Sequence, residues 1–184
     1  MRDRDKLIDY IVILKGHVSD AVCDLIVDTY ETSQHWLPST IGGTNMDRKI
    51  RNCDSIAISK LQKNEDKEID KKLFRLIGSA SLEYAKRFKH YSYNEDTGYD
   101  LLRYLQGGYY KEHVDSFTAH LRSVSCSLAL NYDYEGGEWS FFDDSYSFRV
   151  NKGDIVMFPS NFMFPHQIKE VTFGTRYSVI TWFN

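Results

Sequence analysis

The chain of 184 residues has few cysteines, few prolines and no excess of positive charge. Its three cysteines, Cys23, Cys53 and Cys126, are odd in number and lack C-x-x-C spacing. They therefore argue against a disulfide framework or a zinc knuckle and predict reduced, buried thiols. The scarcity of proline and a hydrophobic share of 42% argue against disorder. A formal net charge of -3 offers no basic footprint for a nucleic-acid partner.

Long apolar runs are also absent. The apolar run near the amino terminus, Tyr10–Leu14, follows Asp9 and ends at Lys15. It is too short for the apolar region of a signal peptide or for a membrane span. We therefore expect a cytoplasmic protein with no membrane partner, and the length favours one domain over two.

The first half of the chain reads as strand and helix in alternation. Tyr10–Leu14 is expected to be a buried strand, and a helix capped by Ser19-Asp20 is expected to follow it. Ser55–Ser59 is expected to be a second strand. Residues 34–52 lack periodicity, so we expect a long loop there that acts as a lid. A second helix is predicted from Glu65 to Phe88, with apolar residues near helical spacing at Ile69, Leu73, Leu76, Ile77 and Leu82.

The second half changes to the two-residue period of strands. Between Arg122 and Asp133, apolar residues from Val124 to Tyr132 alternate with small or polar ones, which predicts a half-buried strand. Further strand patterns (EGGEWSFF, SYSFRVNKGDIVMFP and TRYSVITWF) are separated by turn pairs at Gly136-Gly137, Asp143-Asp144 and Lys152-Gly153. Many short strands with turns between them predict a β-sandwich or barrel.

The stretch YYKEHVDSF, Tyr109 to Phe117, contains a histidine and an aspartate two residues apart. In an extended chain, His113 and Asp115 point to the same side with Cα atoms about 6.5–7 Å apart. They can converge on a metal ion, or they can pair only with each other on a solvated surface. His120 is an alternative ligand, but its odd offset from Asp115 places it on the opposite face if the strand continues.

Two further groups extend this pair. His166 follows a strand pattern in FPHQI, and Arg176 and Ser178 share one face of the last strand pattern, TRYSVITW. Two imidazoles and one carboxylate are the ligands of the facial triad that holds non-haem Fe(II). A guanidinium beside a hydroxyl suits a carboxylate. Together these residues predict an iron site with a dicarboxylate co-substrate.

Four stretches carry a resemblance to a known family: RYLQGGYYKEHVD, EGGEWSFF, NKGDIVMFP and HQIKEVTFGTRYSVITWF. From about Leu101 to its end, the chain resembles the Fe(II)- and 2-oxoglutarate-dependent dioxygenases, and specifically the prolyl 4-hydroxylase-like branch. One position departs from the collagen-type members, which have lysine where this chain has Arg176. The sub-branch is therefore left open.

The resemblance implies a β-rich α+β fold, a double-stranded β-helix (jelly roll) with amino-terminal helices packed against one sheet. It implies a single domain, 1–184, in which residues 1–99 support a core at 100–184 that binds metal and co-substrate. The implied metal ligands are His113, Asp115 and His166. The implied 2-oxoglutarate ligands are Arg176, Ser178 and Tyr104.

The implied activity is hydroxylation of an unactivated C–H bond, in prolyl residues of a peptide or protein, with Fe(II), 2-oxoglutarate and O2, and with ascorbate as sustaining reductant. Tyr110, Arg122 and Trp182 match positions that line the substrate groove of the resembling enzymes. The open alternatives are a hydroxylase of a free amino acid or other small molecule, and a non-catalytic jelly-roll binding module. A nucleic-acid dealkylase of this fold is disfavoured by the net charge of -3. It is also disfavoured by Trp182, because the resemblance to those enzymes would require a second arginine at this position.

Overall fold

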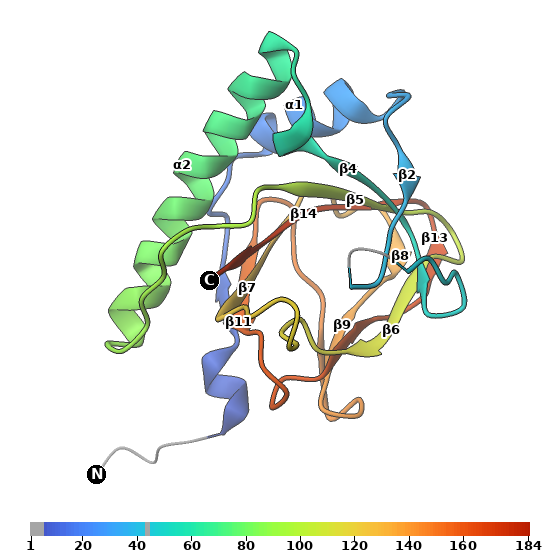
Figure 1. Cartoon of the computed structure of the whole chain (residues 1–184). Helices are drawn as coiled ribbons and strands as arrows, with labels where there is room; N and C mark the ends of the chain where they lie inside the picture. Colours follow the sequence, from blue (N-terminus) through green and yellow to red (C-terminus); the bar gives the residue numbers. More distant parts are fainter. Residues whose placement is uncertain (1–5, 43–44) are drawn as a thin grey trace.

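A computed structural model describes residues 6–42 and 45–184 (Figure 1). Its two α-helices are α1 (Asp20–Tyr30) and α2 (Asn64–Arg87), with 3-10 turns at η1 (Leu7–Tyr10) and η2 (Ile58–Lys60). The larger sheet has the strand order β1 (Val12–Leu14), β11 (Ile155–Pro159), β7 (Val124–Ala129), β14 (Arg176–Phe183), β5 (Asp100–Tyr104), β4 (Asp54–Ala57) and β2 (Leu37–Pro38).

The smaller sheet has the order β10 (Tyr146–Phe148), β9 (Trp139–Phe141), β12 (His166–Ile168), β6 (Tyr109–His113) and β3 (Arg51–Asn52). A two-stranded ribbon joins β13 (Val171–Phe173) to β8 (Glu135–Gly136). All named pairings are antiparallel. The two sheets form the expected double-stranded β-helix. One hydrophobic core lies between the larger sheet and the helices, and a second lies between the two sheets.

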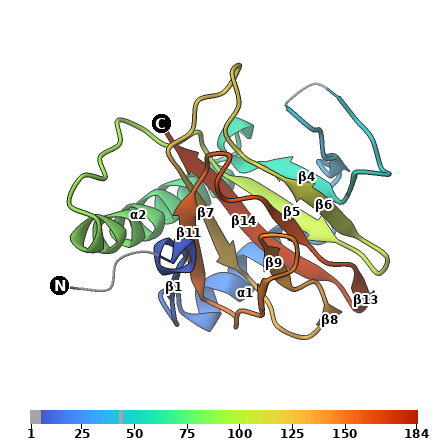
Figure 2. The same ribbon diagram turned by 90° about the horizontal axis from the view of Figure 1, so that it is seen from below.

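The helices cover the outer face of the larger sheet (Figure 2). Leu73 and Ile77 of α2 and Ile26 of α1 are fully buried against sheet residues such as Leu101 and Val179. Burial of such a face stabilises a helix more than its intrinsic propensity does. Leu82, which the sequence places near helical spacing with these residues, is nevertheless 61% exposed, and the buried stripe continues through Ala80 and Tyr84.

The inner face of the larger sheet turns toward the smaller sheet. Along β5, Leu101 packs in the helix-facing core, whereas Leu102 and Tyr104 pack in the core between the sheets. The same alternation places Val179 outside and Ile180 inside on β14. Polar residues on the inner positions of these strands are therefore enclosed by the second sheet.

The strand β7 differs from its prediction. All six of its residues are buried, so the strand is not half-buried, and Tyr132 lies beyond its end and is 54% exposed. The physical reason is that its polar face, with Ser125 and Ser127, lines an internal cavity instead of facing solvent.

The amino-terminal half largely follows its predictions, with differences at element ends. Residues 34–52 are not all loop, because β2 and β3 pair with β4 and β6. The second predicted strand ends at Ala57, where η2 begins. Ser19 precedes α1 without a side-chain capping bond. The three cysteines are free and buried, as expected. In the described part of the chain, none of the helices combines the length with the apolar character that crossing a bilayer requires.

Candidate active site

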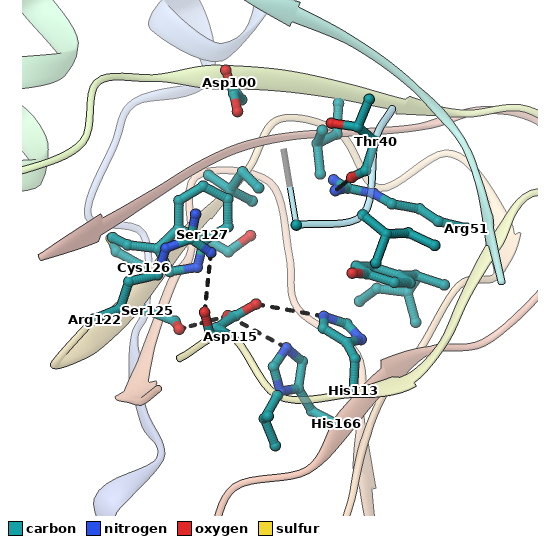
Figure 3. Close-up of a pocket in the computed structure, with 18 of the residues that line it drawn as sticks. Thr40, Arg51, Asp100, His113, Asp115, Arg122, Ser125, Cys126, Ser127 and His166 are labelled. Carbon is teal, nitrogen blue, oxygen red and sulfur yellow. Dashed lines mark hydrogen bonds and ion pairs between the residues drawn. The ribbon is translucent and has the colours of Figure 1, made fainter. Parts of the chain in front are cut away.

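A cavity of about 510 Å³ lies between the two sheets (Figure 3). His113, Asp115 and His166 line it on the side of the smaller sheet, and Tyr104 and Ser125 line it from the larger sheet. Thr40 and Arg51 from the segment 34–52 complete part of the wall. This segment therefore borders the site, as a lid would, but whether it closes stays a prediction.

Strand pairing brings the two histidines together. His166 on β12 and His113 on β6 are direct cross-strand partners, so their side chains emerge on the same face. Asp115 follows the end of β6, and the backbone N–H of Ser116 donates to the carbonyl of Ser160 and fixes this turn. Oδ1 of Asp115 lies 3.5 Å from Nε2 of His113, and Oδ2 of Asp115 lies 3.5 Å from Nε2 of His166. His120 is exposed and lies outside this cluster.

Both imidazoles present the same nitrogen to the cluster. Nδ1 of His113 is 2.8 Å from the carbonyl of Lys111, and Nδ1 of His166 is 3.0 Å from the carbonyl of Phe164. A carbonyl can only accept a hydrogen bond, so each Nδ1 carries the proton. The lone pair of each Nε2 is therefore free to bind a metal ion.

His166 is held neutral by its surroundings. Its side chain is buried, and burial together with the nearby His113 lowers its pKa to about 4. Desolvation penalises the charged imidazolium. At neutral pH the ring is therefore in the form that coordinates metals.

Asp115 is the anionic member of the cluster. Burial by itself raises the pKa of this carboxyl group, but His166, His113 and a hydrogen bond from Ser125 together hold it below its usual range. The Ser125 hydroxyl donates to Oδ2 over 2.6 Å, and Ser125 and Ser160 share a hydrogen bond of 2.8 Å. The carboxylate is therefore ionised and fixed in orientation.

This donor set fits a divalent metal ion. The three ligand atoms lie within 4.8 Å of one another. An ion bonded at about 2.0–2.2 Å can join two atoms up to about 4.4 Å apart, and both of the 3.5 Å separations from Asp115 fall within that reach. Two imidazoles and one carboxylate on one side leave the other positions of an Fe(II) ion open.

Arg176 and Ser178 do not line the cavity themselves, but Arg176 lies beside two residues that do, Tyr104 and Trp139. Its guanidinium carbon is 5.3 Å from the centre of the Tyr104 ring and 5.8 Å from that of Trp139, and both aromatic residues line the cavity. Its Nη1 donates to the Ser178 hydroxyl over 3.1 Å. Burial raises the pKa of Tyr104, so its phenol stays protonated and can donate. The three predicted co-substrate residues are thus neighbours.

The charge of Arg176 has no counter-ion in the described part of the chain. The side chain is only 2% exposed, its Nε lacks a hydrogen-bond partner, and no described carboxylate pairs with it. Gly137 leaves room for it, because a Cβ there would lie 3.0 Å from Cδ of Arg176. A buried guanidinium with free donors fits an anionic ligand such as a carboxylate.

The predicted substrate residues also border the cavity. The Tyr110 ring stacks on the imidazole of His113 with a centroid distance of 3.5 Å. The Arg122 guanidinium carbon lies 3.6 Å from the centre of the Trp182 ring, and its Nη1 donates to the carbonyl of Asp115. Tyr110, Arg122 and Trp182 therefore form an aromatic and cationic wall beside the candidate metal ligands.

Sequence reasoning missed Arg51, Asp100 and Ser125. Arg51 lies over the Tyr110 ring and donates to the carbonyl of Thr40, within a segment whose sequence has no distinguishing period. Asp100 and Ser125 lie on inner strand positions that line the cavity. Alternation places such polar residues on one face of a strand, but only the packing of the second sheet shows that this face lines an internal cavity.

Comparison with protein families matches residues 99–184 to the model described as the 2OG-Fe(II) oxygenase superfamily. Among curated proteins, a PKHD-type hydroxylase of Idiomarina loihiensis is 41% identical over 86 residues, which cover 44% of this chain and 38% of that protein. The chain thus spans well under half of the length of this relative.

Solved structures share the fold across nearly the whole chain. A prolyl hydroxylase from Trichoplax adhaerens, solved with a peptide fragment of hypoxia inducible factor, has a TM-score of 0.80 at 17% identity and covers 95% of this chain and 83% of its own. A prolyl-4-hydroxylase from Pseudomonas putida has a TM-score of 0.72 at 18% identity, with coverages of 95% and 92%. At these identities the likeness establishes the fold.

Proposed function

We propose, from the match of residues 99–184 to the 2OG-Fe(II) oxygenase superfamily, that the protein is an Fe(II)- and 2-oxoglutarate-dependent hydroxylase of prolyl residues in a peptide or protein. The observation that carries the proposal is the convergence of His113, Asp115 and His166 at a cavity that Tyr104, a neighbour of Arg176, also lines. The names of the relative and of the structural neighbours, all hydroxylases, support the same reaction class.

The metal ligands act as a unit in this proposal. His113 and His166 hold the ion through Nε2 while the carbonyls of Lys111 and Phe164 fix the rings, and Asp115 supplies the negative charge. When bound, Fe(II) with 2-oxoglutarate and O2 supplies the oxidising power for hydroxylating an unactivated C–H bond. The core aromatic residues around His166, including Phe141 and Phe158, keep water from its buried side.

The co-substrate is held at the other end of the cavity. Arg176 supplies charge-assisted hydrogen bonds to a distal carboxylate, with the Ser178 hydroxyl and the Tyr104 ring beside it. Because Arg176 has no competing carboxylate in the described residues, its donors remain available to the ligand.

The substrate lies against the wall of Tyr110, Arg122 and Trp182. An aromatic wall packs a pyrrolidine ring, and a guanidinium donates to peptide carbonyls. The Trichoplax prolyl hydroxylase, whose structure contains a peptide, supports a peptide as the substrate class.

Short proline-containing peptides, incubated with protein, Fe(II), ascorbate and 2-oxoglutarate, test this proposal. Mass spectrometry should show one added oxygen atom on proline. Arg122→Ala and Trp182→Ala should reduce peptide oxidation more than they reduce 2-oxoglutarate decay without peptide. Leu121→Ala serves as the control because its side chain, next to Arg122, is 76% exposed and does not line the cavity.

Two results would contradict the proposal at different levels. If a broad peptide library stays unmodified while a free amino acid or another small molecule is oxidised, the prolyl assignment is wrong and the oxygenase chemistry stands. If 2-oxoglutarate is not consumed with any substrate, the proposed activity itself is wrong.

A further inference from the structure

The inner face of β5 carries a carboxylate at the cavity. Asp100, Leu102 and Tyr104 line the cavity from alternate positions of this strand. Tyr104 is opposite Arg176 in the register with β14, whereas Asp100 is opposite Ile180. Asp100 therefore lies about 13 Å along the strand from the anion-binding end, and Figure 3 shows it across the cavity from Asp115.

Asp100 has no protein partner within the described residues. None of their ion pairs or side-chain hydrogen bonds includes its carboxylate, although it lines the cavity. Burial raises its pKa, and the nearby cations Arg51, Lys60 and Arg122 oppose that effect, although none of the three forms an ion pair with Asp100. Asp100 is partly buried, and a carboxylate that loses part of its hydration without gaining a partner is stabilised when a bound group pairs with it.

The two arginines near Asp100 are engaged elsewhere. Arg51 donates to the carbonyl of Thr40 and lies over the Tyr110 ring, and Arg122 donates to the carbonyl of Asp115 and lies over the Trp182 ring. Neither forms an ion pair with a described carboxylate. The negative charge of Asp100 is thus open to a ligand in the cavity.

The co-substrate is a poor candidate for that ligand. It is itself a dianion, which Asp100 repels, and the guanidinium suited to it lies at the other end of the β5–β14 ladder. Trp182, two residues beyond the β14 partner of Asp100, lies on the same inner face. Asp100 therefore belongs to the part of the cavity that borders the substrate wall.

We propose that Asp100 determines specificity by binding a cationic group, an ammonium or guanidinium, on the substrate. For a peptide substrate this inference rests on the proposed function. It predicts that the protein prefers sequences with a lysine or arginine near the proline. A charged partner is favoured over a neutral N–H donor because charge-assisted hydrogen bonds are about twice as strong.

Peptide binding without turnover tests the inference separately from the activity. The probes are fluorescein-labelled peptides with one central proline, in which a single lysine or, in the matched set, glutamine is moved through the flanking positions. Anisotropy is measured with Mn(II) in place of iron and with 2-oxoglutarate present. At one position lysine should bind about tenfold or more tighter than glutamine, as a hydrogen bond between charged groups contributes.

Asp100→Asn should reduce this lysine-to-glutamine ratio to about one, because the variant keeps the side-chain shape and removes the charge. Asp28→Asn is the matched control, since it makes the same charge change on an exposed position of α1. An unchanged ratio in Asp100→Asn would overturn the inference. So would an equal weakening of both peptides, which is the result if Asp100 only offsets the charges of Arg51 and Arg122.

A second panel covers a small-molecule substrate. Binding of free lysine and of norleucine is followed through tryptophan fluorescence, because Trp139 and Trp182 line the cavity. Lysine should bind more tightly to the wild-type protein and lose this advantage in Asp100→Asn. Absence of a preference for the cationic ligand in both panels refutes the assignment, whatever the hydroxylation assay shows.

Discussion

At the scale of single residues, the candidate metal ligands depend on neighbours that bind no metal themselves. The Ser125 hydroxyl fixes one oxygen of Asp115, and backbone carbonyls fix the Nδ1 proton of both histidines. Such outer contacts orient ligands and tune their basicity. The affinity for metal should therefore respond to changes outside the three ligands.

Ser125→Ala should weaken metal binding by about 10–100-fold, because it removes the 2.6 Å hydrogen bond to Asp115. Calorimetric titration with Mn(II) measures the effect. Ser127→Ala is the matched control, since Ser127 lies two residues further along the same inner face of β7 and forms no side-chain hydrogen bond within the described residues. Equal affinities for the two variants would show that Ser125 does not orient the ligand.

Arg176→Ala should raise the Michaelis constant for 2-oxoglutarate about 30-fold or more, while the affinity for metal changes little. The physical reason is that truncating one partner of a buried charged pair costs about 2–5 kcal/mol. Arg149→Ala, at an exposed arginine that donates to the carbonyl of Tyr134, is the control. If metal binding fell and co-substrate affinity did not, Arg176 would have a structural role.

The sequence allowed the three candidate metal ligands and Arg176 to be predicted, but for different reasons. His113 and Asp115 are two residues apart, whereas His166 was joined to them by the ligand set and by the family resemblance, and its cross-strand pairing with His113 is seen only in the structure. Asp100 and Ser125 escaped notice, because a polar residue on an alternating strand looks the same whether its face meets solvent or a second sheet. Only the packing of the smaller sheet over β5 and β7 distinguishes the two cases.

At the scale of elements, α2 supports the sheet that carries half of the site. Its buried stripe, from Ile69 to Tyr84, packs on the outer face of the larger sheet, opposite the cavity. The helix contributes no residue to the cavity wall. A change in the packing of α2 should therefore affect the stability of the fold more than it affects catalysis.

Leu73→Ala should lower the free energy of unfolding by about 2–5 kcal/mol, because Leu73 is fully buried and its truncation leaves a cavity. Phe74→Ala, at the next residue, should change it by about 0.5 kcal/mol or less, because Phe74 is 64% exposed. Urea denaturation followed by circular dichroism compares the two. A similar loss in both variants would contradict the orientation of α2.

The elements themselves were predicted to different degrees. Long periodic segments gave α2 nearly to its ends. Of the predicted turn pairs, Asp143-Asp144 lies in a hairpin between β9 and β10, whereas Gly136 belongs to β8 and Lys152-Gly153 connects strands of different sheets. Two-residue strands such as β2 and β3 have no period to detect, because each is defined only by its pairing with β4 or β6. The exposure of Leu82 likewise depends on which face of α2 meets the sheet.

At the scale of the whole molecule, the site is assembled from distant parts of the chain. His113 and Asp115 come from the end of β6, Ser125 from β7, His166 from β12 and Arg176 from β14. The cavity between the sheets exists only when both sheets are formed. Binding of metal and co-substrate should thus depend on the complete fold, and ligands that bind only the folded state stabilise it.

The most direct measurement for the proposed activity is Fe(II)-dependent formation of succinate from 2-oxoglutarate by the wild-type protein and by Asp115→Ala. Asp115 supplies the negative charge of the candidate ligand set, and removing one ligand of a facial triad weakens metal binding. The wild-type protein should form succinate with O2 when Fe(II) is present, and the variant should form almost none at the same iron concentration. Equal succinate formation by both proteins would contradict this account. So would a wild-type protein that, with the substrate panel present, forms no more succinate than the variant.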